Sequence, residues 1–303
     1  MLFRDVREAW WLGQSYDKRE VTLYRKSEII RCHITPFFDD MQVEDITDVE
    51  INLYIQHQQQ HGNRLTNGPL CQNSIKKALG VINNVLEYAT AKNYISINPM
   101  VLISKLKSDP PREYSVFLPN EIPLLVTAAR PKWLGDMILL AYHTGMRKEE
   151  IFGLQWGDVD FDNKLLRVNH TIVAVSPHKY YIDGPKNHTS NRIIMLDNDS
   201  MQMLHRRKKC QEKSEWVFAN QYGQAPNPWY SVKYFRNSCI RAEIPHRRFH
   251  DLRHTHITEL MAAGQPPAVV QARAGHADIK MTMRYTHIDP EMQQVIVDFL
   301  NNR

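Results

Sequence analysis

The sequence predicts a mainly α-helical protein with a small antiparallel β-sheet, an α+β fold divided into two domains. Three observations support this prediction. Apolar residues recur at helical spacing over most of the chain. A region in the second half alternates apolar and polar residues, as a half-buried strand does. A charged, proline-containing stretch separates two parts of the 303 residues, each of which is long enough for a core of its own.

Residues 1–104 are expected to form a unit of four helices. The first has an apolar face that begins at Val6, Ala9 and Trp10. The second spans residues 21–34, and we expect Pro36 to end it. Capping residues at Asp45, Thr47 and Asp48 start the third. The fourth is the clearest, with Asn73 as its expected N-cap and an apolar stripe made of Ile75, Leu79, Ile82, Val85, Leu86 and Ala89.

Residues 105–115, KLKSDPPREYS, have the proline and charge content of an extended linker, and residues 116–303 form the second domain. We expect this domain to open with a helix start at residues 118–121 and to continue with a helix over residues 134–143. Gly145 should break that helix, and Arg147 should begin the next. Strand patterns follow at residues 164–175 and 191–196.

Four polar residues near the C-terminus are expected at the ends of helices. His250 and Arg253 are three residues apart and begin one helix, which Gly264 should cap. A second helix should stop at Gly275, so that His276 lies just beyond it. Asp278 should cap a short turn leading to Tyr285.

Such residues are costly in a core but suit a phosphate group. Arginine offers a planar fork that fits two phosphate oxygens, and histidines can donate hydrogen bonds to the same group or move its protons. Tyr285 is the candidate nucleophile. Because an unperturbed tyrosine has a pKa of about 10, its neighbours must activate it.

The motifs HDLRHT, AGHADIKMTMRYTH and the upstream HTGMRKEEI occur together in this order. Their combination resembles the signature of the tyrosine recombinases, the phage integrase family, which cut and rejoin DNA. The resemblance implies a helical core-binding domain that clamps DNA, followed by the family's catalytic domain. It implies that the catalytic residues are Arg147, Lys186, His250, Arg253, His276 and Tyr285.

Two further features belong to the same resemblance. Glu150, one turn after Arg147, matches an acid that supports the family's site. Lys186 is taken from the stretch GPKNHTSNRIIML, whose Ser190, Arg192 and Leu196 fit the family's hairpin motif. Met195 stands where the family usually has proline, so we expect the exit of this hairpin to differ.

The implied mechanism needs no metal, ATP or other cofactor. Arg147 and Arg253 hold the two non-bridging oxygens of the scissile phosphate, and the histidines complete the cage. Tyr285 attacks in line, the 5′ oxygen leaves with a proton from Lys186, and the DNA stays attached through a 3′ phosphotyrosine. The family's usual task is integration or excision of a phage or other mobile element.

The implied partner is double-stranded DNA carrying a recombination site, bound by a tetramer of a protein that is a monomer in solution, with accessory DNA-bending or directionality factors. The net charge of +5 comes from the second part of the chain, because 13 Lys and Arg balance 13 Asp and Glu in residues 1–110. Candidate phosphate contacts are Lys76, Lys77, Arg247 and Arg248. The basic run at residues 205–209 is more typical of a solvated helix end.

The termini and cysteines bear on location and assembly. Charges follow Leu2 and Phe3 at once, and no apolar run reaches the roughly 18 residues of a membrane span. The four cysteines show no CxxC spacing, so we expect a cytoplasmic protein with free thiols. We also expect no N-terminal arm-binding module. An apolar stripe after Pro290 predicts a terminal helix, which we hypothesise docks on a neighbouring protomer.

Other classes of protein share some of these features. His250, His254 and His256 could suggest a zinc enzyme, but no HExxH occurs, and we expect His254 and His256 to be packing or backbone-bonding residues. A two-metal nuclease needs convergent carboxylates, whereas Asp158 and Asp160 look like residues flanking a strand. A type IB topoisomerase, or a DNA-binding regulator on the same fold, remains as an alternative.

Overall fold

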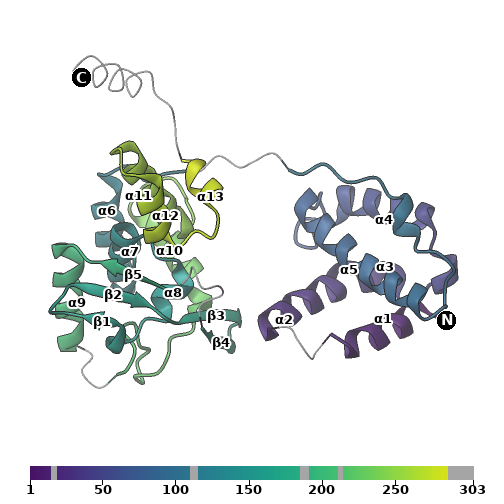
Figure 1. Cartoon of the computed structure of the whole chain (residues 1–303), viewed down its shortest axis with the longest axis horizontal. Helices are drawn as coiled ribbons and strands as arrows, with labels where there is room; N and C mark the ends of the chain where they lie inside the picture. The colour runs from purple at the N-terminus through teal and green to yellow at the C-terminus, as the bar shows by residue number, and fades with distance from the viewer. Residues whose placement is uncertain (15–18, 110–114, 185–190, 211–213, 286–303) are drawn as a thin grey trace, which may run out of the picture. The chain divides into compact units, whose positions relative to one another are not determined.

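The computed structural model describes residues 1–14, 19–109, 115–184, 191–210 and 214–285 (Figure 1). The chain divides into two compact units, residues 1–112 and 113–303, and each is described by itself. Lys186 and the expected helix after Pro290 lie outside the described residues.

The first unit is helical and packs around one apolar core. Its elements are α1 (Phe3–Leu12), α2 (Glu20–Ile29), a π-helical turn (Ile30–Ile34), α3 (Thr35–Phe38), a 3₁₀ turn (Val43–Asp45), α4 (Asp48–His61), α5 (Gln72–Ala91) and a second 3₁₀ turn (Pro99–Leu102). The expected apolar stripe of the fourth helix is confirmed, because its residues line the core on α5. Thr47 caps α4 as expected, in a capping box with Glu50.

Two expectations for the first unit were wrong. Pro36 lies in the first turn of α3 and does not end the helical path, since a proline there lacks only an N–H that has no partner within the helix. Asn73 is not the cap of α5, which begins at Gln72. The backbone N–H groups of Gln72 and Asn73 donate to the carboxylate of Asp109 at 3.1 and 3.0 Å. The start of the expected linker is therefore attached to the first unit.

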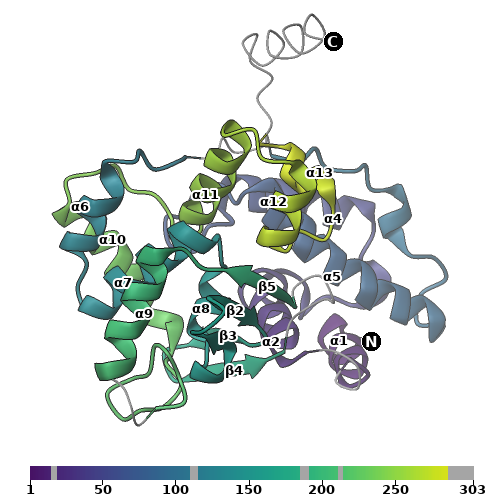
Figure 2. The same ribbon diagram turned by 60° about the vertical axis from the view of Figure 1, so that its left-hand side comes forward.

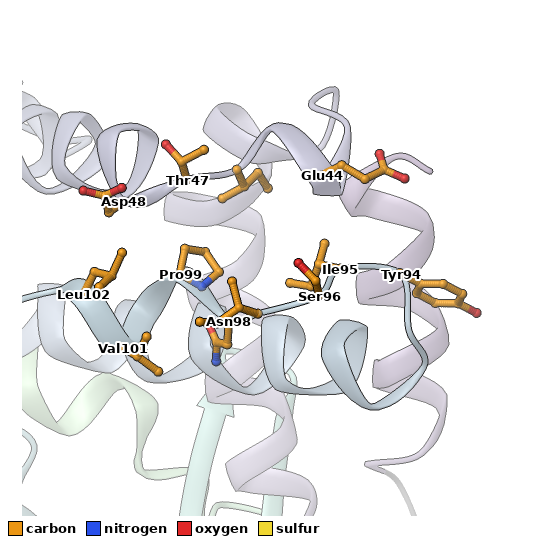
Figure 3. Close-up of a pocket in the computed structure, with 12 residues that line it drawn as sticks. Glu44, Thr47, Asp48, Tyr94, Ile95, Ser96, Asn98, Pro99, Val101 and Leu102 are labelled. Atoms are coloured by element: carbon orange, nitrogen blue, oxygen red, sulfur yellow. The ribbon is translucent and has the colours of Figure 1, made fainter.

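The first unit also contains a surface pocket (Figure 3). The start of α4, with Thr47 and Asp48, lies on one side of it, and residues 94–99, 101 and 102 line the other. None of the predicted catalytic residues lines this pocket, because all of them belong to the second unit.

The helices of the second unit surround a core to which α7 contributes five buried apolar side chains. They are α6 (Glu121–Ala128), α7 (Lys132–Thr144), α8 (Lys148–Phe152), a 3₁₀ turn (Trp156–Asp158), α9 (Asn198–Cys210), a second 3₁₀ turn (Pro228–Tyr230), α10 (Ser231–Arg241), α11 (His250–Ala262), α12 (Pro267–Ala274) and α13 (Ile279–Met283). The last three lie together, with α11 against α7 and α12 against both α11 and α13 (Figure 2). None of the helices in the described ranges is long and apolar enough to span a membrane.

The strands of the second unit form two small antiparallel sheets. One has the order β1 (Val159–Asp160), β2 (Leu165–Val168) and β5 (Arg192–Met195). The other is the hairpin of β3 (Thr171–Ser176) and β4 (Lys179–Asp183). The single strand expected over residues 164–175 is thus two strands. Asn169, between them, donates to the carboxylate of Asp158 at 2.8 Å, and the chain leaves the first sheet there.

Candidate active site

The turn between α7 and α8 places the first arginine of the site. Gly145 ends α7 in the left-handed region with φ of 66°, and a Cβ at this position would lie 2.6 Å from the ring of His256. Glycine is therefore required both by backbone conformation and by space. The chain then turns through Arg147, which precedes α8 as its N-cap residue.

The buried carboxylate of Glu150 holds two arginines. It accepts hydrogen bonds from the backbone N–H and Nη1 of Arg147, both at 2.8 Å. It also accepts from Nη1 and Nη2 of Arg192, on β5, at 3.0 and 2.9 Å. Burial alone would raise the pKa of Glu150, but the hydrogen bonds and charges of Arg192 and Arg147 lower it to about 2. Glu150 is thus ionised and fixes both guanidinium groups.

Arg253 lies on α11 beside the turn at Gly145. Its Nη1 donates to the Gly145 carbonyl oxygen at 2.7 Å, whereas its buried Nη2 has no hydrogen-bond partner among the described residues. Burial and the positive charge of Arg147 lower the pKa of Arg253 to about 9. Arg147 in turn donates from Nη2 to the Gly275 carbonyl oxygen at 3.2 Å. A buried, charged group with a spare donor is well suited to bind an anion.

The two predicted histidines are neutral at pH 7. His276 follows Gly275, which ends α12 in the left-handed region, and its Nδ1 lies 2.8 Å from the hydroxyl of Thr282. His250 begins α11 and reaches the surface. Desolvation, followed by the charges of Arg253 and Arg147, lowers the pKa of each imidazole to about 4.

Tyr285 is buried in the same site, two residues after the end of α13, which Asp278 caps as expected. Its ring stacks against that of His276, with centroids 6.5 Å apart and planes at 13°. Its hydroxyl contacts Nδ1 of His254. The structure therefore brings Arg147, His250, Arg253, His276 and Tyr285 together in the second unit, and Glu150 beneath them.

The expectation that His254 and His256 are packing or backbone-bonding residues is confirmed for His256, which is buried and hydrogen-bonded to the backbone of Tyr142, but it is incomplete for both, because their side chains also contact other side chains. His254 contacts the hydroxyl of Tyr285, and Nε2 of His256 accepts from Nε of Arg273 at 3.1 Å. The i,i+4 rings of His250 and His254 lie 4.8 Å apart, but His256 turns toward Arg273. Within the described ranges, no group of three or more His, Cys, Asp or Glu residues is placed to hold a metal ion.

Two arginines that connect the site were not recognised from the sequence as part of it. Arg192 links Glu150 to α12, because its Nε donates to the Arg273 carbonyl oxygen at 2.7 Å. Arg273 donates to the carbonyl oxygens of His143 and Met195 at 2.9 and 3.1 Å. Met195 is the last residue of β5, so this bond links the end of that strand to α12 at the position where the family usually has proline. The only sequence signal was the place of Arg192 in the hairpin motif.

The four candidate DNA-contact residues differ in their surroundings. Arg247 donates to Glu121 at 2.8 Å and lies over the ring of Phe117, so its largely buried side chain has a structural role that opposes the expected DNA contact. Arg248 pairs with Asp251 at 2.8 Å but stays 55% exposed. In the first unit, Lys76 donates to Ser108 at 2.7 Å and Lys77 is exposed.

Glu150→Gln should destabilise the second unit, because it removes the charge that compensates Arg192. The carboxylate pKa of about 2, against 4.5 normally, corresponds to about 3 kcal/mol of stability at pH 7. Because folding lowers the pKa of this carboxylate, its charge stabilises the folded state at pH values above the unfolded-state pKa of 4.5. This contribution is lost as the pH falls from 4.5 toward 2. Urea unfolding should therefore show a gap between wild type and variant of about 3 kcal/mol at pH 7 and about half that at pH 3.

Glu149→Gln is the matched control, since Glu149 is half-exposed and its carboxylate lies 3.8 Å from the Lys148 ammonium group. It should change the unfolding free energy by no more than about 0.5 kcal/mol. An equal gap for Glu150→Gln at both pH values would contradict the role given to its charge.

Comparison with known proteins matches both units. The model of the phage integrase family matches residues 115–292, and that of the phage integrase N-terminal SAM-like domain matches residues 2–58. A tyrosine recombinase XerC-like protein of Caldanaerobacter subterraneus is 29% identical over 263 residues, 76% of this chain and 67% of that protein. The transposase of transposon Tn916 from Enterococcus faecalis is 30% identical over 167 residues, 50% of this chain but only 41% of the transposase.

Solved structures show the same fold. The Tn1549 transposon integrase in complex with transposon right end DNA has a TM-score of 0.78 at 19% identity, covering 99% of this chain and 100% of that one. A lambda integrase tetramer bound to a Holliday junction has a TM-score of 0.72 at 19% identity, covering 95% of this chain and 78% of that one. The family model spans more than half of the chain, including all the residues of the candidate site. The chain therefore belongs to the phage integrase family of tyrosine recombinases.

Proposed function

We propose that this chain is a site-specific DNA recombinase that integrates or excises a mobile element through a covalent 3′ phosphotyrosine. The observation that carries the proposal is the buried Tyr285, stacked on His276 in a site where Nη2 of Arg253 has no hydrogen-bond partner among the described residues. A nucleophile beside two fixed guanidinium groups is the arrangement that phosphoryl transfer to tyrosine requires. Family membership and relatives named as transposases and integrases support the same function.

The mechanism follows from the charges of the site. Arg147 and Arg253 bind the non-bridging oxygens and stabilise the negative charge that builds on phosphorus. His250 and His276, both neutral, donate hydrogen bonds to the same group. As the Tyr285 oxygen bonds to phosphorus, the bond to the 5′ oxygen breaks and Lys186 protonates that oxygen, a role taken from the family resemblance. A 5′ hydroxyl from a second DNA strand reverses the step, so the energy of the broken bond is kept.

The proposed partner is a duplex recombination site, on which four protomers assemble from monomers. The lambda integrase tetramer bound to a Holliday junction supports this assembly. DNA-bending or directionality factors would bias integration against excision. Lys76, Lys77 and Arg248 are the proposed phosphate contacts, and the protein is expected to act in the cytoplasm. Residues 1–104 would clamp the DNA, residues 105–115 would link the domains, and residues 116–303 would carry the chemistry.

Tyr285→Phe should bind DNA but form no covalent adduct, because it lacks the attacking oxygen. The probe is a duplex enriched from a random-sequence library by binding to the full chain, with a nick placed to trap the cleaved strand. Adducts are detected by gel after denaturation. Tyr222→Phe and Tyr234→Phe are controls that keep a ring of similar size, and both should form the adduct. Adduct formation by Tyr285→Phe would exclude it as the nucleophile.

Replacing either phosphate-binding arginine should slow cleavage strongly. Arg147→Ala or Arg253→Ala removes a preorganised donor to the developing charge, which is typically worth about 100-fold or more in rate. Arg253→Lys should recover little of this loss, because an ammonium group cannot make the bidentate contact. Single-turnover cleavage of the nicked duplex gives the rates. A near-normal rate for Arg253→Lys would contradict the proposed grip on phosphate.

Cleavage should survive excess EDTA, because the guanidinium groups supply the positive charge that a metal ion supplies in other DNA-cleaving enzymes. Rates of adduct formation would be compared before and after dialysis against the chelator. Loss of cleavage that added magnesium or zinc restores would favour a metal-dependent nuclease. Relaxation of supercoiled DNA by single protomers, without exchange of strands between two duplexes, would instead favour a topoisomerase.

A further inference from the structure

We propose that His254 is a further catalytic residue, which accepts the proton of the Tyr285 hydroxyl as that oxygen attacks phosphorus. This inference rests on the function proposed above. It starts from a contact between the proposed nucleophile, Tyr285, and a histidine that is not among the residues carried over from the family resemblance.

The geometry singles out His254 among the histidines of the site. Its Nδ1 contacts the Tyr285 hydroxyl, and the two ring centroids lie 5.6 Å apart with planes at 30°. His276 also stacks on Tyr285, but its Nδ1 is 2.8 Å from Thr282 Oγ1. His254 is only 8% exposed, so the contact is shielded from water. The nucleophile therefore has a ring nitrogen against its oxygen.

The charge state of His254 suits a proton acceptor. Burial and the nearby His250, Arg248 and Arg253 together lower its pKa to about 4, while Asp251 opposes them. From other elements, His276 and Tyr285 face it. The imidazole is thus neutral at pH 7, with one ring nitrogen able to accept. A bound phosphodiester adds negative charge, which raises this pKa toward the working pH and makes the transfer more favourable.

The step balances without any added reactant. The Tyr285 oxygen–phosphorus bond forms, the hydroxyl proton moves to Nδ1 of His254, and the bond from phosphorus to the 5′ oxygen breaks. The 5′ oxygen leaves with a proton from the general acid. In the reverse direction a 5′ hydroxyl attacks, the Tyr285 oxygen leaves, and His254 returns its proton to it.

The test is the pH dependence of cleavage by His254→Asn. Asparagine places a polar atom near the position of Nδ1 but cannot take a proton at working pH. Only ionised Tyr285 can then attack, and its fraction rises about tenfold per pH unit below a tyrosine pKa of about 10. The ratio of wild-type to variant cleavage rate on the nicked duplex should fall about tenfold per unit between pH 7 and 9. Groups common to both proteins cancel in this ratio.

His256→Asn is the matched control, because His256 is a buried histidine on the same helix that contacts Arg273 and not Tyr285. Whatever its effect on rate, the ratio to wild type should not vary with pH. His254→Gln is a second variant in case asparagine prevents folding. A pH-independent ratio for the His254 variants, or cleavage at the wild-type rate, would overturn the proposal.

A second measurement does not depend on cleavage. Nitrogen-15 resonances of the His254 ring, assigned by difference with His254→Asn, should shift in Tyr285→Phe protein without DNA, because that variant lacks the hydroxyl. If the His254 resonances are the same in Tyr285→Phe and wild type, the proposal is overturned even if wild type forms the covalent adduct. If the resonances shift in Tyr285→Phe but the wild-type protein binds the duplex without forming an adduct, the contact between His254 and Tyr285 stands. The proposed recombinase activity is then refuted, and the proton transfer with it.

Discussion

The second unit depends most on one buried negative charge, the carboxylate of Glu150. It accepts four hydrogen bonds, two from Arg147 and two from Arg192. These bonds join the start of α8 to strand β5, and Arg192 extends the connection to α12 through the Arg273 carbonyl oxygen. A carboxylate with so little exposure is stable only if its charge is compensated, and removing it would leave the guanidinium groups to repel each other. The same acid thus stabilises the fold and aims Arg147.

One carboxylate does not neutralise the site. Arg147, Arg192 and Arg253 contribute positive charge, and desolvation adds to their effect by lowering the pKa of Arg253 and of the neighbouring histidines. The protein alone therefore carries an unfavourable concentration of positive charge, with a buried donor of Arg253 lacking a partner among the described residues. In the proposed function a bound phosphate would relieve both costs, and we therefore infer that the site favours an anion.

The sequence patterns correctly predicted the features that neighbouring residues determine, namely helix ends and caps. The helix stops at Gly145 and Gly275 and the cap at Asp278 follow from residues within one turn, and together they place Arg147, His276 and Tyr285. Contacts between distant residues were missed. Asp109 caps α5 from 37 positions away, and Arg192 reaches Glu150 across 42. Neither pairing leaves a periodic signal in the sequence, and the partner of a buried charge is decided only by packing.

The spacing in HDLRHTH separates the roles of its histidines once the helix is placed. On an α-helix, residues three and four apart share a face, whereas those two apart do not. His250, Arg253 and His254 therefore face the proposed phosphate site together, and His256 is directed to Gly145 and Arg273. The i,i+4 histidine pair that suggested a zinc site instead leaves His250 exposed at the start of α11 and places His254 against the hydroxyl of Tyr285. Because the face is fixed by helical geometry, substitutions that keep α11 intact cannot exchange the roles of His254 and His256.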